Sequence, residues 1–245
     1  MFERAGQKAK PEDLINVDDL LAAYYDLEPD PTEPSQRVSF GTSGHRGSAF
    51  DHAFNEAHIV AITQAIVEYR RNQGINGPLF IGRDTHALSE PAHRSALEVL
   101  VANGVDVRID SRNSYVPTPA VSLAILQANG APGKVRTSGA DVADGIVITP
   151  SHNPPRDGGF KYNPPTGGPA DVDATGWIAD RANQIIEDGW RNVPRSTLSD
   201  LSRADCVHPH DYLREYVDAL PSVIDLDAIR SAGVRIGADP LGGAS

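Results

Sequence analysis

The spacing of apolar residues predicts that helices and short strands alternate along most of this chain. Four segments place apolar side chains on one face of a helix: residues 12–27, 55–74, 89–104 and 118–130. Four short apolar runs are typical of strands: residues 78–82, 105–109, 144–149 and 159–162. Because helices alternate with strands, we expect an α/β fold, a three-layer α/β/α sandwich around a short mixed sheet.

The two ends of the chain depart from this alternation. Residues 28–36 carry three prolines in an acidic stretch and are expected to form a linker, preceded by a helix that is either solvated or docked on the domain. A helix is predicted over residues 209–220, and a new strand within residues 232–239. A strand and a Gly-Gly turn normally lead into a helix, so we expect a truncated sequence.

These patterns divide the chain into three parts. Residues 1–36 form an N-terminal helical arm and linker, and residues 37–208 form an α/β domain. Residues 209–245 form a connecting helix and the start of a second, similar domain.

Charge and composition exclude several classes of protein. The formal net charge is -11 over 245 residues, and no basic stripe could follow a nucleic-acid backbone, so a nucleic-acid partner is excluded. No apolar run approaches the ~20 residues of a membrane span, and the first residues lack the apolar segment of a signal peptide. Cys206 is the only cysteine, which fits a reducing compartment. We therefore expect a soluble, cytoplasmic chain without a membrane partner.

A serine follows one of the predicted strands in a setting suited to chemistry. The sequence reads T-P-S-H-N-P-P over residues 149–155, and Lys161 follows after a short interval. Taken alone, the segment also fits a turn in which Asn153 caps its own backbone. A serine hydrolase is disfavoured because neighbouring side chains of an extended segment point apart, which places His152 badly as a base for Ser151. The G-x-S-x-G elbow of such hydrolases is also absent.

A second segment, F-G-T-S-G-H-R-G over residues 40–47, has the composition of an anion-binding loop. Glycines let backbone N–H groups converge, hydroxyls donate hydrogen bonds, and a guanidinium binds an oxyanion through two parallel bonds. The segment is neither a P-loop nor a dinucleotide-binding fingerprint, and alone it also fits a tight turn. His45 in this segment, and His86 elsewhere, are expected to make structural hydrogen bonds.

Taken together and in this order, the two segments resemble the α-D-phosphohexomutase superfamily, with its bacterial members that act on glucose phosphates as the nearest likeness. The resemblance covers essentially the whole chain and includes four further motifs: G-F-K at residues 159–161, G-R-D-T at 82–85, P-T-P at 117–119 and D-P-L-G-G-A-S at 239–245. It implies the fold of phosphohexomutase domain I and small hexose phosphates as substrates. It also implies interconversion of glucose 1-phosphate and glucose 6-phosphate through a phosphoserine and a glucose 1,6-bisphosphate intermediate.

The resemblance implies a catalytic role for four residues. Ser151 is expected to be the phosphoserine that donates its phosphoryl group to the sugar. Lys161 is expected to transfer a proton or stabilise charge beside it, and Arg46 to hold the phosphate. His152 is expected to shape the loop and contact phosphoryl or sugar oxygens, as is the substrate-binding Asn153. Two cations near the serine agree with phosphoryl transfer, which requires positive charge around the equatorial oxygens.

The remaining implied features concern substrate and metal. Thr42, Ser43 and Gly44 are expected to line the phosphate-binding side of the same site. Mg²⁺ is implied as a cofactor bound through the phosphate on Ser151, but the family's D-G-D-x-D-R metal loop, G-E-x-S sugar loop and C-terminal phosphate loop do not occur in this sequence. We therefore expect this chain to be inactive alone, with the missing C-terminal domains or a homo-oligomer as partners. The alternative is a non-catalytic phosphosugar-binding module derived from such an enzyme.

Overall fold

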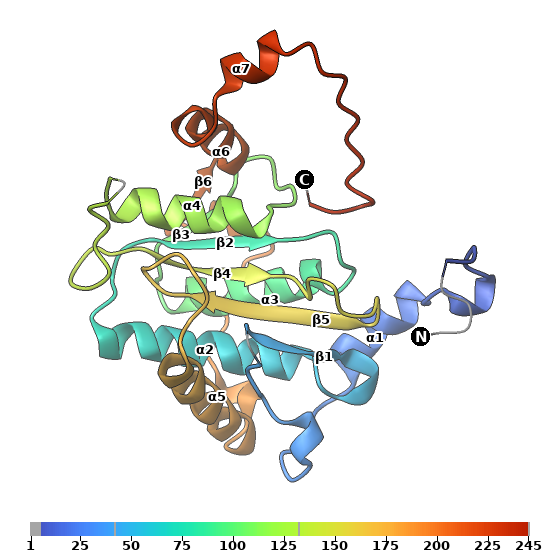
Figure 1. Ribbon diagram of the computed structural model, residues 1–245. Coiled ribbons are helices and arrows are strands. Elements are labelled where there is room, and N and C mark those ends of the chain that lie inside the picture. The colour runs from blue at the N-terminus through green and yellow to red at the C-terminus, as the bar shows by residue number, and fades with distance from the viewer. Residues whose placement is uncertain (1–5, 42, 132, 245) are drawn as a thin grey trace.

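The computed structural model describes residues 6–41, 43–131 and 133–244, and in it a mixed sheet lies between two layers of helices (Figure 1). The strand order is β1-β5-β4-β2-β3-β6, in which β5 is antiparallel to β1 and β4 while the other pairs are parallel. The strands are β1 (His45–Ser48), β2 (Leu79–Arg83), β3 (Val107–Asp110), β4 (Asp144–Ile148), β5 (Asp157–Asn163) and β6 (Val207–His210). The predicted three-layer sandwich with a short mixed sheet is confirmed.

Helices cover both faces of the sheet, and each face has its own apolar core. One core joins the sheet to α1 (Val17–Asp26), α2 (Glu56–Gln73), α3 (Ser89–Ala102) and α5 (Val172–Glu187). The other core joins it to α4 (Thr118–Asn129) and the start of α6 (Tyr212–Ala219), which α7 (Leu226–Ser231) follows (Figure 1). Within the described residues, none of the helices has the length and apolar character needed to cross a lipid bilayer.

The ends of α2 show how sequence signals set the boundaries of a helix. Asn55 stands at the N-cap position, as predicted, and its backbone N–H donates to His58 Nδ1 at 3.1 Å. Gly74 ends the helix with a φ of +68°, a left-handed conformation in which glycine is favoured. Both predicted ends of this helix are confirmed.

The C-terminal part of the chain differs from its prediction in two places. The helix expected from residue 209 begins at Tyr212, because residues 207–210 pair with β3 as the edge strand β6. Pro209 lacks an N–H donor and is tolerated in this strand because the outer side of an edge strand needs no partner. The strand expected within residues 232–239 does not form: these residues are exposed, and no described strand pairs with them.

The N-terminal arm docks on the domain, which decides between the two alternatives for this segment. Its helix α1 is shorter than predicted, because the Asn16 side chain caps it by accepting two backbone N–H bonds. Leu20 and Tyr24 of α1 are fully buried, whereas Leu14, expected on the same helix face, is exposed. The Asn55 amide also donates to the carbonyl of Ala23 at 2.7 Å, so that polar as well as apolar contacts hold the arm.

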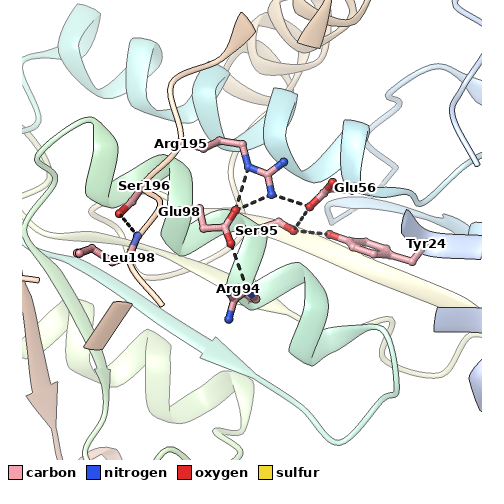
Figure 2. Close-up of polar contacts among 8 residues, drawn as sticks. All are labelled: Tyr24, Glu56, Arg94, Ser95, Glu98, Arg195, Ser196 and Leu198. Atoms are coloured by element: carbon pink, nitrogen blue, oxygen red, sulfur yellow. Dashed lines mark hydrogen bonds and ion pairs between the residues drawn. The ribbon is translucent and has the colours of Figure 1, made fainter. Parts of the chain in front are cut away.

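A network of polar side chains strengthens this docking (Figure 2). Tyr24 Oη donates to Ser95 Oγ at 3.0 Å, and Ser95 Oγ lies 3.2 Å from a Glu56 carboxylate oxygen. Arg195, from the segment after α5, donates to Glu56 at 2.6 Å and to Glu98 at 2.9 Å (Figure 2). Because the Arg195, Glu56 and Glu98 side chains are mostly shielded from water, these charge-assisted bonds join the arm, α2, α3 and the segment around residue 195 into one unit.

A buried ion pair fixes the start of β4, the strand that leads to Ser151. Arg70 Nε donates to both carboxylate oxygens of Asp144 at 3.0 and 2.9 Å, and Tyr162 Oη donates to the same carboxylate at 2.8 Å. Burial raises the pKa of Asp144 despite the nearby guanidinium, which shows how strongly this carboxylate is desolvated. Asp144 therefore compensates the positive charge of Arg70 at a site that is shielded from water.

Removing one member of this pair should destabilise the fold strongly. We expect Asp144→Ala to lower the free energy of unfolding by about 3–5 kcal/mol, because it leaves the Arg70 charge buried without compensation. Urea unfolding measures this change. The exposed pair of Arg214 and Asp218, 2.8 Å apart on α6, provides the control: Asp218→Ala should cost less than about 1 kcal/mol. Equal costs for the two substitutions would contradict the interpretation.

Candidate active site

Ser151 lies in the hairpin loop that joins β4 to β5. The backbone N–H of Thr149 donates to the Gly159 carbonyl at 2.9 Å, and Thr149 Oγ1 accepts a 3.0 Å bond from the N–H of Ser151. Ser151 has a φ of +64° and is exposed. A left-handed conformation is uncommon for a residue with a side chain, and such outliers cluster at active sites. The fold therefore presents this hydroxyl to solvent on a constrained bend.

Lys161 reaches Ser151 across the same hairpin. It stands opposite Val147 in the antiparallel pairing of β4 and β5, and its Nζ donates to Ser151 Oγ at 2.8 Å. Burial lowers the pKa of Lys161, the positive charge of Arg46 lowers it further, and Asp84 opposes the change. This lysine therefore releases its proton more readily than an exposed lysine and can exchange a proton with the serine hydroxyl.

Two glycines allow the backbones around this lysine to approach closely. A Cβ atom on Gly44 would lie 2.5 Å from Lys161 Cγ, and a Cβ atom on Gly159 would lie 2.2 Å from the Thr149 carbonyl oxygen. Gly44 also has a φ of +84°. Only glycine fits at these two positions without moving the strand or the hairpin.

Arg46 is held on the same sheet face as Lys161. It pairs with Gly159 across β1 and β5, and the alternation of side chains along β1 turns it away from the core that buries His45. Arg46 donates to Asn153 Oδ1 and to Ser43 Oγ, both at 2.9 Å. Its guanidinium is thus fixed beside the serine loop.

A cleft in front of Ser151 opens where β2, β3 and β4 end. It has a volume of about 410 Å³ and is lined by residues 84–86, 116–118, 149–151, 153 and 240–244. The connection from β2 leads to its neighbour β3, whereas the connection from β4 leads to β5 on the other side, so the cleft beside these two strands lies at a switch point of the sheet. Ligands of open α/β sheets bind at such points, outside the carboxyl ends of the strands.

Most of the predicted site residues lie together. Lys161 is hydrogen-bonded to Ser151, and Arg46 is hydrogen-bonded to Asn153 of the same loop and to Ser43. Gly44 packs against Lys161. Thr42 lies outside the described residues.

His152 and His45 differ from these residues. His152 is exposed and has no hydrogen-bond or ion-pair partner among the described residues, so nothing pairs it with Ser151 as a base. His45 is buried with Nδ1 at 3.2 Å from the Ser39 carbonyl oxygen, as expected of a structural histidine.

The sequence reasoning missed Asp84, which lines the cleft and whose negative charge raises the pKa of Lys161. The motif G-R-D-T, which ends a strand and places Asp84 directly after it, was the available signal for this residue.

The fit of the site to a divalent metal is limited. Among residues 6–41, 43–131 and 133–244, no three His, Cys, Asp or Glu side chains gather closely enough to hold a metal ion. A phosphate on Ser151 would supply oxygen ligands, which Mg²⁺ prefers. The described residues alone therefore do not complete a Mg²⁺ site.

Comparison with known proteins agrees with this geometry. Over residues 37–188 the sequence matches the family phosphoglucomutase/phosphomannomutase, alpha/beta/alpha domain I. It is 55% identical over 241 residues to a phosphoglucomutase of Komagataeibacter xylinus. The aligned region covers 98% of this chain and 42% of that protein. It is 29% identical over 214 residues to a phosphoglucomutase of Schizosaccharomyces pombe, covering 84% and 36% of the two chains.

The fold is similar to the crystal structure of parafusin, a Paramecium phosphoglucomutase, in its open form. The TM-score is 0.59 at 21% sequence identity, over 83% of this chain and 37% of that one. The present chain thus spans less than half the length of these relatives. The chain belongs to the phosphoglucomutase/phosphomannomutase family, with the family's alpha/beta/alpha domain I at residues 37–188.

Proposed function

We propose that this chain is the phosphoserine-bearing part of a phosphoglucomutase, which interconverts glucose 1-phosphate and glucose 6-phosphate. The observation that carries the proposal is the 2.8 Å hydrogen bond from the Lys161 ammonium to the hydroxyl of the exposed Ser151. Arg46 supplies a second positive charge next to this pair. The choice of glucose is supported by the 55% identical relative, whose name is phosphoglucomutase.

The proposed chemistry is transfer of one phosphoryl group in either direction. When Ser151 accepts a phosphoryl group, its Oγ forms a bond to phosphorus while the bond from phosphorus to the sugar oxygen breaks. The hydroxyl proton passes to neutral Lys161 Nζ, and the released sugar oxygen takes a proton from water. In the reverse direction the Lys161 ammonium returns a proton to Ser151 Oγ as the phosphoryl group leaves.

The other site residues have binding roles in this proposal. Arg46 holds the equatorial phosphoryl oxygens and neutralises their developing charge, because a guanidinium offers two parallel donors to an oxyanion. Ser43 and Asn153 each accept a hydrogen bond from Arg46 and keep it oriented. Gly44 leaves room for the Lys161 stem. His152, which is exposed, is proposed to contact sugar or phosphoryl oxygens rather than to act as a base.

The complete enzyme is proposed to work in the cytoplasm with Mg²⁺ and with glucose 1,6-bisphosphate as intermediate and activator. This chain would contribute to the metal site only the phosphate on Ser151, with the other ligands outside the described residues. We propose the division into residues 1–36, 37–208 and 209–245. The family match that begins at residue 37 supports the first boundary, whereas strand β6 (Val207–His210) runs across the second.

Phosphate uptake tests the proposal. Incubation of the chain with glucose 1,6-bisphosphate should place one phosphate on Ser151, located by intact mass and peptide mapping. Ser151→Ala should take up none, because among the described residues Ser151 is the one whose hydroxyl is hydrogen-bonded to Lys161 Nζ. Ser222→Ala, at a serine whose hydroxyl donates to the Ala219 carbonyl far from the cleft, is the control and should keep wild-type uptake. A phosphate located elsewhere would count against the assignment.

Two other outcomes would favour the alternatives. Saturable binding of hexose phosphates without any phosphate on Ser151 would favour a non-catalytic phosphosugar-binding module. Covalent capture of a phosphonate probe by Ser151 would favour a hydrolase that uses a Ser–Lys pair, an arrangement known on other folds.

A further inference from the structure

The Ser151 loop, defined here as residues 150–156, lies at the surface apart from the buried Pro150. Ser151, Pro154 and Pro155 are exposed, and Ser151 has a left-handed backbone conformation. Such a conformation persists only where neighbouring groups over-determine it. Contacts from outside the loop must therefore hold the hydroxyl in place.

Besides the bonds within the β4–β5 hairpin, from Lys161 to Ser151 and from Asn153 to Asp157, three side chains from other parts of the described chain contact this loop. Arg46 of β1 donates to Asn153 Oδ1 at 2.9 Å, and Asp51 forms an exposed ion pair with Arg156. The third contact comes from the opposite side of the hairpin, where His86 Nε2 lies 2.7 Å from the Pro155 carbonyl oxygen. Exposed ion pairs contribute little, so Arg46 and His86 are the two principal attachments from outside the hairpin.

The hydrogen bonds of His86 define the tautomer of its ring. Nδ1 lies 3.1 Å from the backbone N–H of Leu88, which can only donate. The Pro155 carbonyl at the other ring nitrogen can only accept. A neutral ring with its proton on Nε2 satisfies both partners, accepting from Leu88 and donating to Pro155.

The turn that carries His86 is itself fixed to the sheet. The backbone N–H of Asp84 donates to the carbonyl of Ile148, the last residue of β4, at 3.0 Å. The Asp84 carboxylate accepts from the N–H of His86 at 3.0 Å and from Ser89 Oγ at 2.6 Å. His86 is thus anchored to the strand that leads into the Ser151 loop, and it contacts the far end of the same loop.

We propose that His86 is a positioning residue for phosphoryl transfer, which holds the Ser151 loop by donating from Nε2 to the Pro155 carbonyl. The proposal rests on the proposed function of Ser151. His86 does not touch the reacting atoms. It acts by keeping Ser151 Oγ next to Lys161 Nζ, since small displacements of a reacting group are costly in rate.

A matched pair of substitutions tests this role. The His86→Asn side chain can accept from Leu88 but is too short to reach Pro155, whereas the His86→Gln side chain has an amide donor at the reach of Nε2. Hydrogen exchange of the loop amides should become about fivefold faster in His86→Asn, the factor expected for one hydrogen bond, and stay near wild type in His86→Gln. The rate of phosphate uptake by Ser151 should fall about 10- to 100-fold in His86→Asn, with little change in the KM for glucose 1,6-bisphosphate, and should be largely restored in His86→Gln.

Several results would overturn the proposal. Wild-type exchange of the loop in His86→Asn, or a His86→Gln variant no better than His86→Asn, would remove the role of the Nε2 donor. The control Arg156→Gln, which breaks the exposed pair with Asp51, should leave exchange and uptake near wild type, and an effect as large as that of His86→Asn would also contradict the proposal. If wild-type chain takes up no phosphate, the proposed function fails and the catalytic role of His86 with it, while the exchange data still decide whether His86 holds the loop.

A measurement on the wild-type chain covers the case in which His86→Asn does not fold. The ¹⁵N chemical shifts of the His86 ring should report the tautomer with its proton on Nε2. A proton on Nδ1 would be incompatible with the bond to Pro155 and would overturn the proposal.

Discussion

Replacing Lys161 with methionine is expected to slow phosphate uptake on Ser151 by about 10²- to 10⁴-fold, the range contributed by a positioned proton-transfer group. Lys161 Nζ lies 2.8 Å from Ser151 Oγ, and a methionine side chain at this position cannot accept the hydroxyl proton. Methionine keeps a long unbranched stem in the buried channel beside Gly44, so the packing of the hairpin should be retained. Time-resolved intact mass after addition of glucose 1,6-bisphosphate measures the rate.

The pH dependence of uptake separates proton transfer from a purely electrostatic effect. Because burial and Arg46 lower the pKa of Lys161, the limb of the pH–rate profile that it controls should lie below 10.5, the ordinary value, and should vanish in Lys161→Met. Lys161→Arg keeps the charge but cannot release a proton in this range, and it should be nearly as slow as the methionine variant. An arginine variant with wild-type rate would show that only charge is required.

The arrangement of Ser151 and Lys161 was predictable because it depends on local patterns. The apolar run at residues 144–149 ends in the T-P-S segment, and the next short strand begins soon after it. An antiparallel return across so short a loop places Lys161 beside the strand that carries the serine. The sequence does not fix the register, which decides that Lys161 rather than Tyr162 faces the serine.

The features that the sequence did not reveal depend on distant partners. The H-R-G-S segment of β1 is polar and short. It becomes a strand only because it pairs with β5, which lies far from it in the sequence. The V-H-P-H segment of β6 contains a proline and becomes a strand only at the edge of the sheet, against β3. The contact between His86 and Pro155 joins two loops that follow neighbouring strands β2 and β4, and no spacing along the chain signals it. Local propensity cannot report pairings of this kind, since tertiary contacts override it.

A fall in pH from 7 to 5 is expected to destabilise this chain by about 6 kcal/mol, owing to three buried histidines. Burial lowers the pKa of His45 to about 4 and that of His58 to about 3, and each ring lies against the other with centroids 5.1 Å apart. Burial together with the charge of Arg83 lowers the pKa of His93 to about 3. In the unfolded chain all three have the ordinary value of 6.5.

The chain loses stability as the pH falls because protons bind to these histidines in the unfolded chain and not in the folded chain. Between pH 7 and 5 the unfolded chain gains a proton on each histidine while the folded chain does not, so each contributes a loss of about 2 kcal/mol. The stabilisation is complete above pH 6.5 and is lost as the pH falls toward the folded pKa values of about 3 to 4. The total is comparable to the whole stability of many domains, about 5–15 kcal/mol. Urea midpoints measured at the two pH values test the prediction, and equal midpoints would contradict it.

Single substitutions assign this effect to individual rings. His58→Gln removes one titrating group while its amide can still donate to the Gln36 carbonyl, so the loss between pH 7 and 5 should shrink by about 2 kcal/mol. His208→Gln, at a side chain that is about half exposed, is the control for removal of a histidine outside the core.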